Sequence, residues 1–376
     1  MKKILAIFLS AAVCLGIMAS CESKKRSEFS GTVSELGFKP AAVKTQWISL
    51  YEKEPSESDD GQEMYDVTQP VIGDRNQGFW FTTRQYNPGC RNVYRQKTFF
   101  EMEKTLLPIF AYELCPAEDE LYWIGCEPDG DAVLRLWKTD LKTLENTVVY
   151  TPKDGTVFAA DSLTETSQRG KDFFLWSECA KTGEGGKASD TFTVMALNIV
   201  SGEITPLFEQ KTEISRYCPP VICNGHIAYV QEDADGKKML VGMNLESRET
   251  VELFALDKNT DAAAFDGTRL AVVLDGKLYT KSLDEKELTP IPEAQGVHDC
   301  YVFDGLLIFC GDGEEQQSAV FLYDTRVART IFSSENCEGP EGKASFLQTR
   351  WDPWYECLWV RTDKPTENYA VLVTVN

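Results

Sequence analysis

Side chains that could carry acid–base or nucleophilic chemistry are sparse in this sequence. It contains two histidines, His226 and His298. A serine hydrolase needs a histidine beside its nucleophile, and no G-x-S-x-G segment is present. His226 opens an apolar run directly after a turn glycine, which favours a structural imidazole. His298 and Asp299 precede another apolar run, from where they could line a ligand site, although a structural His298 is the more economical interpretation. We predict no catalytic residue and take His298 and Asp299 as ligand-binding candidates.

The most unusual aromatic cluster is RWDPWY at residues 350–355. Exposed tryptophans at Trp351 and Trp354 could stack on sugar rings or anchor a protein partner. The alternative, which we favour, is that these large rings pack between neighbouring sheets. Arg216 and Tyr217 precede an apolar run just as His298 and Asp299 do. These four residues complete the predicted ligand-binding set.

No pattern predicts a metal ion or a cofactor. Acidic turns at 127–131, 233–236 and 311–315 resemble calcium loops, but the twelfth position from Asp233 is Asn244, where an EF-hand loop requires glutamate. Asp and Gly simply suit the backbone angles of turns. The sequence has no Walker or dinucleotide glycine loop and no Cys-x-x-Cys pair for zinc. Among 59 acidic residues, a carboxylate pair for glycoside hydrolysis cannot be recognised without geometry.

The cysteines indicate buried thiols more than a disulfide framework. Ten of the twelve follow Cys21, and many lie inside apolar runs, where cysteine acts as a small buried hydrophobe. We expect one or two bridges at most. The spacing allows Cys300–Cys310 across a hairpin and Cys218–Cys223 around a Pro-Pro pair.

The first twenty residues have the three-part order of a signal peptide. Lys2 and Lys3 precede an apolar stretch, residues 4–17, and Met18-Ala19-Ser20 then leads into Cys21. A cysteine at this place resembles the lipobox of bacterial lipoproteins, which implies an acylated (for example palmitoylated) Cys21. An uncleaved membrane helix is the alternative, but the stretch is shorter than the ~20 residues a span needs. We expect a signal peptide at 1–20, a polar tether at 21–34 and an extracytoplasmic location anchored by lipid.

The charge excludes some partners. Removing Lys2 and Lys3 with the signal takes the net charge from −21 to −23. Nucleic acid and anionic lipid headgroups are therefore disfavoured, and membrane association would depend on the acyl chains alone. We expect a soluble, monomeric domain beyond the tether.

The rest of the chain repeats one pattern, seen most clearly at residues 300–332: short apolar runs separated by turn residues, typical of an antiparallel meander. Asn-Gly and Asp-Gly pairs precede a strongly apolar strand, and segments such as Asn244-Leu-Glu-Ser-Arg-Glu join two later strands. Seven such apolar strands begin at Phe79, Leu121, Phe173, His226, Arg269, Leu306 and Cys357. A period of about 40 to 50 residues per four-stranded unit predicts an all-β fold, a β-propeller.

The two ends of the chain complement each other. Residues 369–376 correspond to a third strand with no fourth strand after it, and residues 44–51 could supply that strand. Pairing them would close the ring and cover two sheet edges. We predict a single domain at 35–376 with seven blades, six or eight being the alternatives.

The segments of the form strand, D/N-L-x-S/T-G/x-E turn, strand resemble those of bacterial TolB-like and quinoprotein-like β-propellers, some of which are lipoproteins. The resemblance covers roughly residues 65–376 and specifies structure more than activity. We therefore expect a binding or scaffolding module for a protein or glycan partner. The alternative is a glycan- or peptide-processing enzyme with acidic residues in a central channel.

Overall fold

The computed structural model divides the chain into two compact units, Met1–Lys39 and Pro40–Asn376, and every residue it describes lies in the second. The described residues are 43–49, 72–73, 79–85, 91–96, 104–117, 119–126, 133–158, 167–170, 172–182, 187–211, 221–256, 260–313, 318–336, 338–339, 342–343, 346–352, 357–362 and 369–375. They are almost entirely β-structure, with one short 3-10 helix, η2 (Ser334–Asn336). No helix among them is long and apolar enough to cross a membrane.

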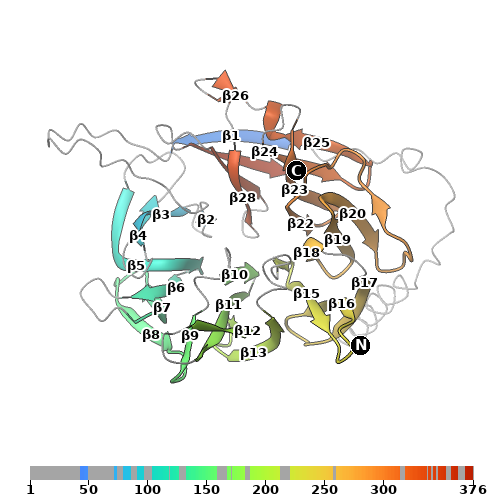
Figure 1. The fold of residues 1–376 in the computed structure, drawn as a ribbon. Helices are drawn as coiled ribbons and strands as arrows, with labels where there is room; N and C mark the ends of the chain where they lie inside the picture. The colour runs from blue at the N-terminus through green and yellow to red at the C-terminus, as the bar shows by residue number, and fades with distance from the viewer. Residues whose placement is uncertain are drawn as a thin grey trace, which may run out of the picture. The chain divides into compact units, whose positions relative to one another are not determined.

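Antiparallel strands form successive sheets along the chain (Figure 1). The longest sheet contains β2 (Ile72–Gly73), β3 (Phe79–Gln85), β4 (Arg91–Gln96), β5 (Lys104–Pro116), β6 (Glu120–Cys126), β7 (Arg135–Asp140) and β8 (Asn146–Tyr150). The next contains β10 (Ser167–Gly170), β11 (Phe173–Thr182), β12 (Lys187–Asn198) and β13 (Ile204–Lys211), with β9 (Thr156–Phe158) also paired to β11.

Three four-stranded sheets follow, each in simple chain order. Their strands are β14 (Val221–Cys223), β15 (His226–Glu232), β16 (Lys238–Asn244) and β17 (Thr250–Leu256); β18 (Thr260–Phe265), β19 (Arg269–Leu274), β20 (Lys277–Ser282) and β21 (Thr289–Pro290); and β22 (Asp299–Phe303), β23 (Leu306–Asp312), β24 (Ser318–Asp324) and β25 (Arg329–Ser333).

The two ends of the described chain share one sheet, in the order β1 (Val43–Ser49), β30 (Tyr369–Val375), β29 (Cys357–Thr362) and β28 (Phe346–Asp352). β1 pairs with β30 over its full length, from Val43 opposite Val375 to Ser49 opposite Tyr369. The predicted pairing of an N-terminal strand with the last strand is therefore present. A two-stranded sheet, β26 (Glu338–Gly339) and β27 (Gly342–Lys343), precedes β28.

The apolar strands predicted from the sequence are confirmed, six of them to the residue. They are β3, β11, β15, β19, β23 and β29, while the strand expected at Leu121 is β6 and begins one residue earlier. The prediction of separate units differs from the structure at β5. The first part of β5 pairs with β4 and the last part with β6, with a register shift on each side. One long strand thus joins two four-stranded groups into a seven-stranded sheet. The number of blades stays a prediction.

The predicted turn residues adopt the predicted angles in two hairpins. Asn224 and Gly225 have φ of 50° and 74°, and Asp304 and Gly305 have 42° and 78°. Such positive angles are those of the tight hairpin turn that Asn-Gly and Asp-Gly favour. Asp266-Gly267 differs, because only Gly267 has a positive φ, at 95°. There the buried Asp266 accepts the N–H groups of Thr268 and Arg269 instead.

The second predicted turn also recurs with the same hydrogen bonds. Asn198 Oδ1 accepts the N–H groups of Val200 and Ser201 at 2.9 and 3.0 Å. Asn244 Oδ1 does the same for Glu246 and Ser247, both at 2.9 Å. Asp140 serves Lys142 and Thr143 in the same way.

The two kinds of turn are bonded to each other in five sheets. In each, the residue that follows β7, β12, β16, β20 or β24 donates its N–H to a carbonyl of the turn before β6, β11, β15, β19 or β23. The pairs are Leu141 to Asp119, Ile199 to Asp172, Leu245 to Gly225, Leu283 to Thr268 and Thr325 to Gly305, at 2.8 to 3.1 Å. Both turns therefore lie at the same end of each sheet. This repeated hydrogen bond links the two kinds of predicted turn segment, which alternate along the sequence.

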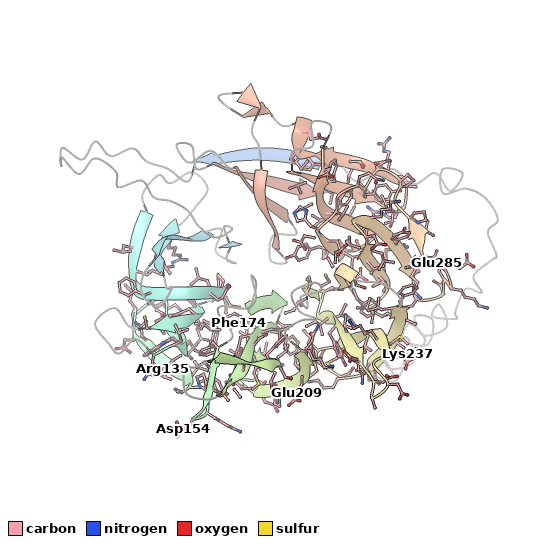
Figure 2. All side chains as sticks on the ribbon, viewed as in Figure 1. Arg135, Asp154, Phe174, Glu209, Lys237 and Glu285 are labelled. Atoms are coloured by element: carbon pink, nitrogen blue, oxygen red, sulfur yellow. The ribbon has the colours of Figure 1, made fainter. Side chains whose placement is uncertain are left out.

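Apolar side chains fill the space between neighbouring sheets. Phe174, labelled in Figure 2, lies in a cluster with Trp176, Ile124 and Leu136, which joins β6 and β7 to β11. A second cluster joins β14, β18–β20 and β22–β24. One strand of each sheet also contacts one strand of the next: β5 with β10, β10 with β14, β14 with β18 and β18 with β22. Burial between sheets is the main source of stability, because no single sheet could cover both its faces.

The two disulfides that the cysteine spacing allowed, Cys300–Cys310 and Cys218–Cys223, do not form. In the β22–β23 register Cys300 lies opposite Phe309, and Cys310 lies opposite Asp299, so the two thiols are not directly across from each other and do not form a disulfide. Cys223 is a buried thiol with no bridge to Cys218. Burial raises the pKa of the Cys223 thiol to about 12.

Candidate functional site

The most chemically distinctive group among the described residues is a buried carboxyl, that of Glu178. It lies on β11, and only 7% of the residue is exposed. Trp176 Nε1 donates to Glu178 Oε1 at 2.7 Å, and the Tyr150 hydroxyl donates to Oε2 at 3.1 Å. Both carboxyl oxygens are therefore bound by neutral donors. None of the ion pairs that the structure describes involves Glu178.

Glu178 and its two hydrogen-bond donors come from two neighbouring sheets. Trp176 and Glu178 are two residues apart on β11, so their side chains lie on the same face of the strand. Tyr150 ends β8 in the preceding sheet, and the chain then turns through residues 151–155 into β9, where Phe158 lies opposite Glu178. The Tyr150 and Phe158 rings lie 5.6 and 6.5 Å from the Trp176 ring. The rings at the end of β8 and the end of β9 thus both pack on Trp176, which donates to the carboxyl.

Burial dominates the electrostatics of the site. Loss of water raises the pKa of Glu178, and the hydrogen bonds from Trp176 and Tyr150 and the charge of Lys153 only partly oppose it. Burial, reinforced by the Glu178 carboxylate, raises the pKa of Tyr150 to about 12. The tyrosine therefore keeps its proton at neutral pH, and Glu178 is the titrating member of the pair. The arrangement can accept or hold one proton away from water.

Of the six predicted ligand-binding residues, the structure describes the side chains of two. His298 is exposed, with Nδ1 3.5 Å from the carbonyl of Gly296. Asp299 is half-buried and begins β22. Trp351 lies on β28 opposite Leu358, and its side chain is outside the described part. Arg216, Tyr217 and Trp354, like Cys21, lie outside the described residues. Whether these residues share a site stays a prediction.

Sequence reasoning missed Glu178 and Tyr150, although a signal was present. The run FFLWSECA places a glutamate in a segment whose other residues, apart from Ser177, are apolar. A carboxyl in such a run must find donors when the strand is buried. Its partner could not be named, because Tyr150 belongs to another sheet.

The acidic turn at Asp233 behaves as turn chemistry predicts. Asp233 Oδ1 accepts the N–H groups of Asp235 and Lys237 at 3.0 and 2.8 Å. In the described part of the chain, no three His, Cys, Asp or Glu side chains gather where a metal ion could be held. The acidic turns at 127–131 and 314–315 lie outside that part.

Solved structures with this arrangement of sheets identify the fold. Oligogalacturonate lyase from Vibrio parahaemolyticus superposes with a TM-score of 0.54 at 12% identity, covering 90% of this chain and 99% of the lyase. The β-propeller domain of the Trilobed protease from Pyrococcus furiosus has a TM-score of 0.54 at 14% identity, covering 83% of this chain and 96% of that domain. This chain is a β-propeller.

The likeness concerns the fold alone. An acylaminoacyl peptidase matches the propeller with a TM-score of 0.55 at 14% identity, over 84% of this chain and 52% of the peptidase. No protein-family model matches the chain, and a search of curated proteins finds no match. The Trilobed protease propeller is described as having an open velcro topology. In the present chain, β1 and β30 pair.

Proposed function

We propose that this propeller is a lipid-anchored, extracytoplasmic module that binds a protein or glycan partner. One structural observation carries the preference for binding over catalysis: three described side chains of catalytic type, those of His226, Asp266 and Asp324, are engaged in turns. His226 contacts Asn224 and Asn244, and Asp266 caps the turn after β18. The buried Asp324 binds Arg326 through both oxygens at 2.9 and 3.0 Å. Side chains committed in this way support a rigid scaffold.

The charge of the mature chain narrows the partner. At a net charge of −23, derived from the sequence without residues 1–20, the surface repels polyanions at long range. An acidic glycan such as the oligogalacturonate named for the Vibrio lyase is therefore a poor candidate. A basic protein surface or a neutral glycan fits better.

The anchor is tested separately from the binding. We expect the full chain to incorporate an alkyne-labelled fatty acid and to partition into the detergent phase, and Cys21→Ala to do neither. Cys14→Ala is the matched control, because it lies in the removed signal segment. Labelling that persists in Cys21→Ala would rule out the proposed attachment site.

Binding is tested with residues 35–376 immobilised at moderate salt. We expect either a neutral glycan from an array or a basic protein from an envelope extract to be retained. Rising salt should release a bound basic protein but not a bound neutral glycan. Equal retention by a propeller of similar charge from another source would show mere ion exchange.

The second candidate function is an enzyme acting on glycans or peptides. The specific observation in its favour is the Glu178 carboxyl, whose raised pKa would suit a general acid. Turnover of a neutral glycan or peptide, abolished in Glu178→Gln but retained in the exposed-residue control Glu209→Gln, would favour it over the binding module.

A further inference from the structure

His226 occupies a joint between two neighbouring sheets. It begins β15, opposite Asn244 at the end of β16. Its Nδ1 lies 3.1 Å from the carbonyl oxygen of Asn224, and its Nε2 lies 3.1 Å from Asn244 Nδ2. The ring also meets the edge of Phe265, with centroids 5.6 Å apart, and Phe265 belongs to the next sheet.

These contacts fix the proton on one ring nitrogen. Asn244 Oδ1 accepts two backbone N–H groups, so that atom must be the oxygen and the atom facing His226 must be the amide nitrogen. An amide nitrogen only donates, so Nε2 of His226 must accept. Nδ1 therefore carries the hydrogen and donates to the Asn224 carbonyl. A second proton on Nε2 would place two donors against each other.

The ring fills a space that the next sheet leaves for it. A Cβ at Gly267 would lie 2.5 Å from a carbon of the His226 ring, so only glycine fits there. Gly267 is in the turn between β18 and β19, with φ of 95°. Movement of the imidazole would therefore disturb the turn of one sheet and the contact with the other.

We propose that His226 is an acid-sensitive joint between the β14–β17 sheet and the β18–β21 sheet. Protonation of Nε2 would break the bond to Asn244, loosen the turn after β16 and separate the ring from Gly267. The same position in the preceding sheet is Phe173, opposite Asn198, which cannot respond.

Charged groups lie on the elements packed around the ring, but the described hydrogen bonds of its two nitrogens go to Asn224 and Asn244. Asp266 caps the turn that contains Gly267, and Arg269 donates to Ser282. Arg248 reaches Thr205, and Glu246 and Glu249 are exposed on the turn after β16. On β14, the residue opposite His226 is Cys223. No ion pair that the structure describes includes His226. The group that faces Nε2 is thus the Asn244 amide nitrogen and not a carboxylate.

The first test is the tautomer. The chain has two histidines, and His298 is exposed, so nitrogen-detected magnetic resonance can assign both rings. We expect His226 with its hydrogen on Nδ1 at about pH 8, a pH at which an ordinary imidazole is neutral. A hydrogen on Nε2 would overturn the proposal, and this result does not depend on any variant folding.

The second test uses Asn244→Asp. A carboxylate can cap the turn, as Asp140 does, and can also accept a hydrogen bond from a protonated Nε2. In the wild type, we expect amide exchange at Glu246, corrected for its intrinsic rate, to rise about tenfold between roughly pH 8 and pH 5, the range over which histidine charges. In Asn244→Asp the same change in pH should slow exchange instead.

Asn198→Asp is the matched control, because its turn is the same but its neighbour is Phe173. We expect no change in the acid response of Val200 or Glu246 in that variant. An acid response that is the same in the wild type and in Asn244→Asp would contradict the joint.

Discussion

Arg248 Nη2 donates to Thr205 Oγ1 at 2.7 Å, which ties the turn after β16 to β13 of the preceding sheet. Arg248 has φ of 63°, an angle that costs an ordinary residue about 1 kcal/mol or more. Gly202 occupies the equivalent position one sheet earlier, with φ of 73°. The strained backbone at Arg248 is therefore offset by a bond between sheets, which a glycine could not make.

Substitutions at the positions equivalent to Arg248 in two other sheets should change the free energy of unfolding in opposite directions. Leu144 has φ of 60°, is 45% exposed and makes no such bridge among the described contacts. Leu144→Gly should raise the free energy of unfolding by up to about 1 kcal/mol, because the strain is removed. Gly202→Ala should lower it by about 1 kcal/mol, since a Cβ there meets no atom within 4 Å and only the backbone angle opposes it. Urea denaturation measures both.

Arg248→Gly is the informative control. Relief of strain and loss of the Thr205 bond should nearly cancel, leaving a change below about 0.5 kcal/mol. A stabilisation equal to that of Leu144→Gly would mean that the bond between the sheets contributes nothing.

The strands were predictable because their signals are local. Asn224-Gly225 and Asp304-Gly305 specify their own backbone angles, and the apolar runs after them specify buried second strands. The pairing of β1 with β30 followed from counting strands in a repeat. Contacts between sheets were not predictable, because Tyr150 and Glu178 or Arg248 and Thr205 meet only once the repeats are placed side by side. The cysteine bridges failed for a related reason, since spacing does not reveal which residue lies opposite Cys300.

Gln210 on β13 is a buried polar side chain with no hydrogen-bond partner among the residues that the structure describes. It is 3% exposed, and neither its Oε1 nor its Nε2 has a partner in the structure. Such a group costs about 1–3 kcal/mol relative to a bonded one. Gln210→Met should therefore raise the free energy of unfolding by about 1 kcal/mol. The exposed Gln231→Met on β15 is the control and should change little. A less stable Gln210→Met would show that the carboxamide is bonded in solution.

The last strand, β30, is an inner strand of its four-stranded sheet. β30 lies between β1 and β29, so removing residues 369–376 leaves two strands without their shared partner. Removing β1 instead exposes only one edge. We expect the C-terminal truncation to abolish a single cooperative unfolding transition and the β1 deletion to lower its midpoint. Circular dichroism and fluorescence, recorded across the same urea series, would separate the two outcomes. A cooperative, equally stable truncated chain would mean that β30 is dispensable.

The raised pKa of Glu178 gives the stability of the propeller a specific dependence on pH. Burial makes the folded state hold this proton more tightly than the unfolded state does. Its contribution is therefore greatest at acidic pH, below the ordinary glutamate range, and is lost as the pH rises through the folded pKa. Glu178→Gln keeps an acceptor for Trp176 and cannot ionise. Its free energy of unfolding should improve relative to the wild type as the pH rises from about 4 to about 7.

Two further variants test whether this dependence of stability on pH comes from the Glu178 site. Glu209→Gln is the matched control, because it makes the same substitution at an exposed position away from the site, and the dependence on pH assigned to Glu178 should persist in it. Tyr150→Phe removes one hydrogen-bond donor to the Glu178 carboxylate. The free energy of unfolding should then fall further as the pH rises than it does in the wild type, by no more than about 3 kcal/mol, the upper value for a hydrogen bond to a charged group. If Tyr150→Phe and Glu178→Gln together behave as Glu178→Gln alone, the hydroxyl acts through the carboxylate. If their effects add, the Tyr150 hydroxyl contributes to stability independently of the Glu178 carboxylate.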